Sequence, residues 1–146
     1  MLYVISGPPA AGKSSYIRAH ARPTDIVIDL DLIATALAGP GAPQWSHDPI
    51  LLKVAHRARF AAIDEALKHR DQVDVYLIHT MPSRKALTRY QRHDATLVTV
   101  DPGRDIVMQR VDDMRDPAMR AVATRWYREH AKRGPSKVTR QTSRSW

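Results

Sequence analysis

The segment GPPAAGKS, residues 7–14, carries the residue types that bind the phosphate groups of a nucleotide. It fits the pattern G-x-x-x-x-G-K-[ST], in which the glycines let successive backbone N–H groups turn toward phosphate oxygens. Lys13 is placed to reach the β- and γ-phosphates, and the hydroxyl of Ser14 is a ligand for Mg²⁺. The sequence therefore predicts a phosphate-binding P-loop that takes ATP or GTP, with Mg²⁺ as a cofactor. The residues expected to contact the nucleotide are Gly7, Pro8, Pro9, Ala10, Ala11, Gly12, Lys13, Ser14 and Ser15.

Two carboxylates, Asp29 and Asp31, come at the end of the second apolar run of the chain. Positions 29 and 31 face the same way while the backbone remains extended. We expect both at the rim beside the P-loop, where an acceptor hydroxyl must meet the γ-phosphate. Asp31 is predicted to be a general base, and Asp29 a substrate contact that also holds Mg²⁺ through water. In the alternative interpretation, Asp29 ends the strand and Asp31 caps the next helix.

The third apolar run, residues 73–79, has no acidic residue at its carboxyl end. A hydrolytic P-loop ATPase usually carries an acid there, which holds Mg²⁺ and orients water. Asp74 lies near the start of the run, at the wrong edge of the expected sheet. The pattern therefore favours a kinase over a motor ATPase. Thr80, directly after the run, is expected to contact the acceptor, whereas His79 can face the same pocket or pack at the strand end.

Arginines crowd residues 104–128, a stretch interrupted by the pair Asp116-Pro117. Mobile arginines that close over a transferring phosphoryl group stabilise its charge and exclude water. The stretch is predicted to form an arginine-rich helical lid in which Arg110 and Arg115 are catalytic. Arg84 and Arg120 are predicted to contact the substrate. Any single one of these arginines can instead be a solvated surface residue.

Strand-like and helix-like segments alternate along the chain. Apolar runs predict strands at residues 2–6, 25–29, 73–79 and 95–100, and helical spacing predicts helices at 14–20, 32–38, 50–69, 83–92, 104–114 and 118–131. Such alternation is typical of an α/β protein with a parallel sheet covered on both faces. We expect a three-layer α/β/α sandwich of the P-loop NTPase class with four or five strands, its P-loop at the carboxyl end of the first strand. Residues 1–133 form the expected domain, and residues 134–146 an expected flexible basic tail.

The charge of the chain is unevenly distributed. Residues 79–146 carry 15 basic and 7 acidic side chains, which accounts for the whole net charge of +8. This half of the chain is a candidate surface for nucleotide phosphates or nucleic acid. There is no cysteine, and the histidines show no metal-binding spacing. No apolar stretch approaches the roughly 20 residues that a membrane span needs, and the first strand runs straight into the glycines without room for a signal peptide. We therefore expect a cytoplasmic protein with no membrane partner.

Three segments together resemble a known group of enzymes: GPPAAGKSS from residue 7, VIDLD ending at Asp31, and MQRVDDMR at residues 108–115. The sequence resembles the small AAA-type P-loop kinases related to the kinase domain of bacteriophage polynucleotide kinase and to zeta-toxin-like kinases. The resemblance spans roughly residues 2–130. It implies that Asp31 is the general base and that Arg110 and Arg115 belong to the lid. Polynucleotide kinases carry an arginine three residues after that aspartate, whereas this chain has Ala34.

These observations predict an ATP-dependent phosphotransferase that moves the γ-phosphate to a hydroxyl of a nucleoside, a nucleotide or a nucleic-acid 5′ end. Two alternatives remain. A nucleotide monophosphate kinase, whose acceptor is already a phosphate, would need no general base. An accessory protein could bind nucleotide and nucleic acid through its basic half and hydrolyse ATP only slowly.

Overall fold

A parallel sheet forms the centre of the structure, a computed structural model that describes residues 1–43, 46–114, 116–132 and 139–141. The strands are β1 (Leu2–Ser6), β2 (Ile26–Ile28), β3 (Val75–Ile78), β4 (Thr96–Val100) and β5 (Thr139–Gln141). Their order is β2-β3-β1-β4-β5, and every neighbouring pair is parallel. The predicted α/β class with a parallel sheet is confirmed.

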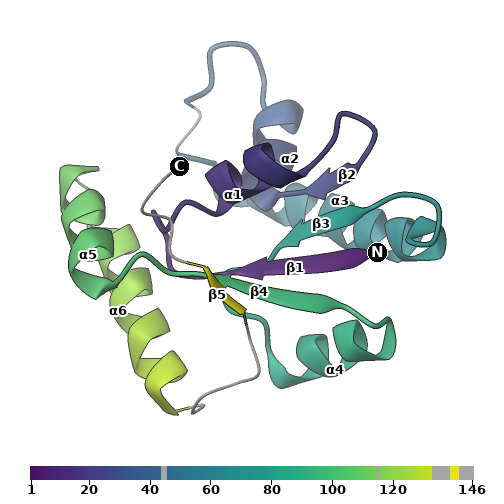
Figure 1. Cartoon of the computed structure of the whole chain (residues 1–146). Helices are drawn as coiled ribbons and strands as arrows, with labels where there is room; N and C mark the ends of the chain where they lie inside the picture. Colours follow the sequence, from purple (N-terminus) through teal and green to yellow (C-terminus); the bar gives the residue numbers. More distant parts are fainter. Residues whose placement is uncertain (44–45, 115, 133–138, 142–146) are drawn as a thin grey trace.

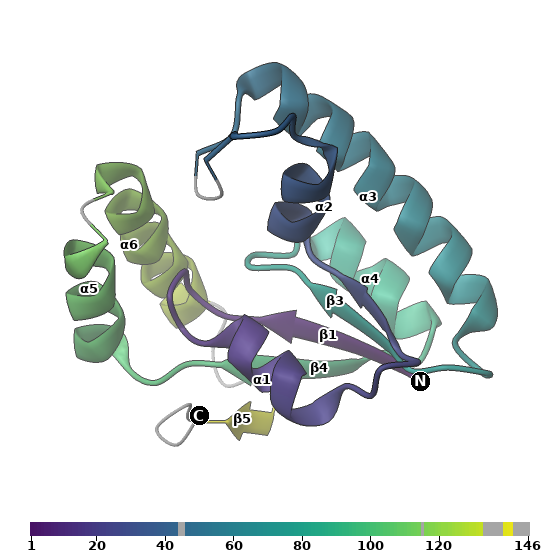
Figure 2. The same ribbon diagram turned by 90° about the horizontal axis from the view of Figure 1, so that it is seen from above.

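Helices cover both faces of this sheet, which makes three layers (Figure 1, Figure 2). One hydrophobic cluster joins the sheet to the helices α1 (Lys13–His20), α5 (Arg104–Asp113) and α6 (Pro117–Lys132). A second cluster joins the opposite face to α3 (Pro49–His69) and α4 (Arg84–Arg92). The remaining helix, α2 (Leu30–Leu37), follows β2 and packs against α3.

The central strand β1 shows why the sheet must be covered on both sides. Leu2 and Val4 pack into the cluster under α3 and α4, whereas Tyr3 and Ile5 face α1, α5 and α6. Successive side chains of a strand point to opposite faces, so an almost continuous apolar run is stable only between two layers of helices. Leu2, Val4 and Ile5 are accordingly almost fully buried.

The predicted boundaries agree with the structure to within two residues, and the caps explain the differences. Ser83 caps α4, because its hydroxyl accepts a hydrogen bond from the N–H of Ala86 at 3.2 Å. The cap of α2 is Asp29 rather than Asp31, since a carboxylate oxygen of Asp29 accepts from the N–H of Asp31 at 3.0 Å. The helix therefore begins at Leu30, two residues earlier than predicted.

Part of the expected flexible tail is a strand. Residues 139–141 pair with β4, with Thr139 beside Val98 and Gln141 beside Val100. The expectation of a tail without structure is therefore wrong for these three residues. Without β5, the backbone groups along one side of β4 would be an open edge, and pairing satisfies them. Residues 133–138 and 142–146 lie outside the described part of the chain.

Candidate functional site

The glycine loop, residues 7–14, lies at the carboxyl end of the central strand β1, at the edge of the sheet near α5 and α6 (Figure 2). Three of its residues have positive φ: Gly7 at 145°, Ala10 at 58° and Gly12 at 98°. Alternation between left- and right-handed residues turns successive N–H groups into one concavity, which suits an anion. Gly12 caps α1 without a side chain, so the first N–H groups of that helix have no side-chain cap. An anion at this position would complete the helix end.

Gly7 is required by the packing of the sheet as well as by its φ. A Cβ atom at this position would overlap the backbone carbonyl oxygen of Val100, the last residue of β4. On the same edge the hydroxyls of Ser6 and Thr99 lie 3.2 Å apart and are hydrogen bonded. The start of the loop is therefore clamped between β1 and β4, which sets the direction in which the loop leaves the sheet.

Lys13 folds back into the loop. Its ammonium donates to the carbonyl oxygens of Gly7 at 3.0 Å and Pro8 at 2.6 Å. Burial lowers the pKa of Lys13 to about 8, against the attraction of the carboxylates of Asp29 and Asp31, which raises it. The charge is thus held by carbonyl dipoles and by two carboxylates that act from a distance. A phosphate in the loop would supply the anion that a buried ammonium lacks.

Asp29 and Asp31 both lie at the start of α2, directly after β2, but in different environments. Asp29 is 9% exposed, and its pKa is raised chiefly by burial. The side chain of Asp31 is 77% exposed, and its carboxylate lies 3.9 Å from Nε2 of His47. Because β3 lies between β1 and β2, one strand separates the two aspartates, which follow β2, from the glycine loop, which follows β1. Asp31 is therefore the carboxylate that an incoming molecule can approach.

The oxygen donors near the loop fit Mg²⁺. Ser14 is exposed in the first turn of α1, and its hydroxyl and the carboxylate of Asp29 are hard donors of the kind that Mg²⁺ prefers. Within the described residues no group of three or more His, Asp or Glu side chains could hold a metal by itself. Mg²⁺ usually relies on one or two protein oxygens, waters and phosphates of the substrate, so this sparse donor set suits it.

The other loop residues are mostly structural in their contacts. Pro8 and Ala11 are buried, and the N–H of Ala11 lies 3.4 Å from the carbonyl oxygen of Pro8. Pro9 is half-buried. The hydroxyl of Ser15 accepts a hydrogen bond from Arg18 at 3.0 Å.

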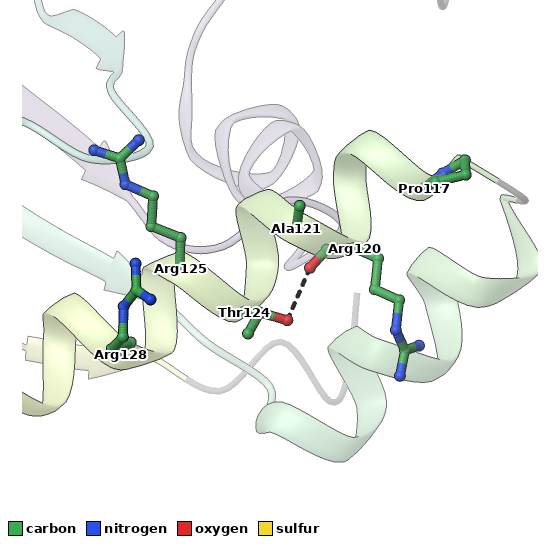
Figure 3. A pocket seen from close by; sticks show the side chains of 6 residues that line it. All are labelled: Pro117, Arg120, Ala121, Thr124, Arg125 and Arg128. Carbon is green, nitrogen blue, oxygen red and sulfur yellow. Dashed lines mark hydrogen bonds between the residues drawn. The ribbon is translucent and has the colours of Figure 1, made fainter.

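Of the predicted lid arginines, the structure brings Arg110 to the loop. Its guanidinium donates to the carbonyl oxygen of Ala10 at 2.9 Å, which ties α5 to the loop residue with the left-handed backbone. Arg115 lies outside the described residues. The guanidinium of Arg120 points to α5 and pairs with Asp112, whereas Arg125 and Arg128 extend from elsewhere on α6 (Figure 3). Arg120 is thus engaged by a carboxylate of α5, and its contact with the substrate stays a prediction.

The remaining predicted residues lie around the end of β3. The carbonyl oxygen of Thr80 accepts from the indole N–H of the buried Trp126 at 3.0 Å, which fastens α6 to the sheet. Trp126 is thus a core residue. Arg84 is exposed at the start of α4. Burial and the charge of Arg59 lower the pKa of His79 to about 4, and its Nδ1 is hydrogen bonded to the hydroxyl of Tyr90 at 2.9 Å.

Sequence reasoning missed two residues. Arg59 is 7% exposed and has an Nε without a hydrogen-bond partner in the described residues. The signal was available, because Arg59 is four residues after Ala55 and falls on the apolar stripe of its helix. The side chain of His47 is 7% exposed beside Asp31, and neither ring nitrogen has a hydrogen-bond partner within the described part of the chain. No pattern of the sequence pointed to that loop histidine.

Comparison with known proteins supports the fold. No protein-family model matches the sequence, and no curated protein does so. A chain from the solved structure of the Pnkp1/Rnl/Hen1 complex is similar to this chain, with a TM-score of 0.51 and 16% sequence identity. The match covers 99% of this chain and 42% of that one, so this chain spans less than half the length of its structural relative. Among the described residues, no helix combines the length and hydropathy needed to cross a membrane.

The packing of Gly7 against Val100 leads to a prediction about stability. Gly7→Ala is expected to lower the free energy of unfolding by roughly 3 kcal/mol, because the new methyl group overlaps backbone and the φ is unfavourable for alanine. Gly39→Ala is the control, since an added Cβ there meets nothing within 4 Å. It should change stability by less than about 0.5 kcal/mol. Urea denaturation measures both, and equal effects would contradict the packing argument.

The buried ammonium leads to a prediction about pH. The pKa of Lys13 is about 8 in the folded protein and 10.5 when the chain is unfolded. Between these values the unfolded chain binds more protons, so the contribution of Lys13 to stability rises with pH. Relative to Lys13→Met, the wild type should gain about 2 kcal/mol between pH 7.5 and 9.5. Denaturation at both pH values measures this difference, and a difference that does not vary with pH would show that the ammonium is not destabilised by burial.

Proposed function

We propose that the chain is an ATP-dependent phosphotransferase that moves the γ-phosphate to a hydroxyl of a nucleoside, a nucleotide or a nucleic-acid 5′ end. The observation that carries the proposal is the buried ammonium of Lys13 inside the glycine loop. The carboxylates of Asp29 and Asp31, at the edge of the sheet, interact with this ammonium electrostatically. The loop supplies a place for phosphates, and the rim supplies a group that can take a proton. A site that only bound nucleotide would not need a group that accepts a proton.

In this proposal the glycine loop is a P-loop, and its residues hold the triphosphate. Lys13 turns from the carbonyl oxygens of Gly7 and Pro8 to the β- and γ-phosphates, and Ser14 holds Mg²⁺. Mg²⁺, when bound, neutralises charge on the phosphates. Arg110 already reaches the loop at Ala10, and adds positive charge where the transferred group passes.

Asp31 acts as the general base. The acceptor oxygen forms a bond to the γ-phosphorus while the bond from that phosphorus to the bridging oxygen of ADP breaks, and the hydroxyl proton passes to the carboxylate of Asp31. Asp31 suits this role better than Asp29, because its side chain is exposed and accessible. Asp29 is buried and occupied as the cap of α2, so it positions the backbone of Asp31.

The similarity to a solved structure supports the fold on which this proposal depends, and not the reaction itself. The chain from the Pnkp1/Rnl/Hen1 complex shares the arrangement of nearly the whole of this chain at low identity. The motifs that resemble the polynucleotide kinases and zeta-toxin-like kinases lie on that fold at the loop, at Asp31 and on α5. The resemblance and the site geometry therefore point to the same reaction class.

A transfer assay tests the reaction. Radiolabelled ATP with Mg²⁺ is offered to a panel of nucleosides, nucleotides and 5′-hydroxyl oligonucleotides. We expect labelled product with at least one hydroxyl acceptor, and its loss in Lys13→Ala. In Asp31→Asn, kcat should fall by about 100-fold or more while ATP affinity stays within threefold, because a base acts on the chemical step.

Other outcomes of the assay identify the alternatives. Transfer to nucleoside monophosphates alone, unaffected by Asp31→Asn, would indicate a nucleotide monophosphate kinase. ATP binding without transfer to any acceptor would indicate an accessory nucleotide-binding protein. Either result contradicts the proposed hydroxyl phosphotransferase.

Arg110 leads to a second prediction. Arg110→Ala should lower kcat by at least about 10-fold, because it removes a cation at the transferring phosphate. Arg104→Ala is the matched control, since Arg104 is an exposed arginine in the first turn of the same helix. Steady-state kinetics measure both, with circular dichroism to verify folding. Equal effects of the two substitutions would mean that Arg110 contributes only general positive charge.

A further inference from the structure

A groove between α3 and α4 continues from the carboxyl end of β3. Its volume is about 970 Å³, at the upper end of the range for small-molecule sites. The helices lie on the same face of the sheet (Figure 2), and the groove opens over the side chain of His79. Its lining is rich in basic side chains, and none of the described residues that line it is acidic. The basic residues are Arg59, Lys85, Arg89 and Arg92.

Arg59 is the buried cation of this groove. One terminal nitrogen donates to the carbonyl oxygen of Ile78 at 2.8 Å, while Nε has no partner in the described residues. A guanidinium carries five N–H donors and stays charged, so its burial with unpaired donors is costly. A bound anion with several acceptor oxygens would satisfy this group.

The neighbours of Arg59 leave room for an anion. Asp29 attracts the guanidinium electrostatically but forms no ion pair with it among the described residues. At the rim, the carboxylate of Asp64 pairs with Arg89, so one of the four basic groups is already neutralised. Tyr90 and His79 are hydrogen bonded to each other, and His79 is uncharged at neutral pH. Positive charge therefore remains in excess inside the groove.

The groove is connected to the proposed reaction site. The carboxylate of Asp29 interacts electrostatically both with Lys13 of the glycine loop and with Arg59 of the groove, so it lies near both. The strand β3, which ends at the groove, is bonded to β1, which ends at the loop. A molecule that presents a hydroxyl at Asp31 can therefore extend into the groove.

We infer that the groove binds a phosphate group of the acceptor through the guanidinium of Arg59; this inference rests on the proposed phosphotransferase function. The acceptor is then a molecule with both a free hydroxyl and a phosphate, which is the chemistry of a nucleotide unit. Phe60, the only phenylalanine of the chain, is 52% exposed at the groove and offers a ring on which a base can stack.

Binding measurements test the inference with two sources of phosphate. The probes are thymidine 3′-monophosphate and a single-stranded hexadeoxynucleotide with a 5′-hydroxyl, and thymidine is the phosphate-free control. Isothermal titration of the full chain gives each Kd. We expect Arg59→Gln to weaken both phosphate probes by about 10-fold or more, and to leave ATP within threefold. Arg57→Gln, which removes an exposed arginine of the same helix outside the groove, should leave every Kd within twofold.

The rim distinguishes the two sources. The double variant Lys85→Gln/Arg92→Gln should weaken the hexadeoxynucleotide more than the mononucleotide, and should flatten its salt dependence, if a strand runs along the groove. Equal small effects on both probes identify a single nucleotide as the acceptor. Either result is consistent with binding of the phosphate group by Arg59. Unchanged affinity of both probes in Arg59→Gln overturns the inference.

A second measurement needs no variant, in case Arg59→Gln fails to fold. In ¹⁵N-labelled wild-type protein, titration with thymidine 3′-monophosphate should shift the Nε–H resonance of Arg59 and the amide signals of His79 and Tyr90. Shifts elsewhere with these signals unmoved would overturn the inference. Failure of the proposed function is distinguishable, because phosphate binding at Arg59 without any phosphoryl transfer removes the reaction but leaves the binding site.

Discussion

The positive charge of Lys13 is buried in the turn between β1 and α1, and the geometry of the site follows from how this charge is held. Two carbonyl oxygens of the loop accept hydrogen bonds from its ammonium, while the carboxylates of Asp29 and Asp31 stay at a distance. A direct ion pair would have made the site stable and closed. Carbonyl dipoles stabilise the ammonium less strongly, so a phosphate can replace the carbonyl oxygens as its hydrogen-bond partner. The pKa of Lys13 is low because these interactions only partly offset the cost of burying its charge.

The strand order decides what can surround that charge. Because β3 lies between β1 and β2, the two aspartates are separated from the loop by the width of one strand. The end of β3 thus lies between the loop and the aspartates, and His79, which follows β3, lines the groove together with Arg59. On the other side, β4 packs against Gly7 so closely that no side chain fits. The sheet thus closes the side of the loop that faces β4.

Sequence patterns predicted the helices, the strands and the glycine loop, because each of these is encoded by neighbouring residues. The alternation of apolar runs and helical spacing placed the elements, and the glycine pattern placed the loop, each from neighbouring residues. The role of Arg59 depends on helix packing across the sheet, and the helix spacing showed only that it lies on a buried stripe. The pairing of Arg120 with Asp112 depends on how α6 folds against α5, which spacing does not encode. The strand β5 was missed because its residues are polar, and only the open edge of β4 explains it.

The central claim is that the ammonium of Lys13 exchanges its carbonyl partners for nucleotide phosphate. A crystal structure of the chain with Mg²⁺ and a non-hydrolysable ATP analogue tests this directly. The account predicts a γ-phosphate oxygen within about 3 Å of Nζ of Lys13, with the bonds to Gly7 and Pro8 broken. It also predicts the hydroxyl of Ser14 among the Mg²⁺ ligands. A nucleotide bound elsewhere, with Lys13 still on the two carbonyl oxygens, would contradict the claim.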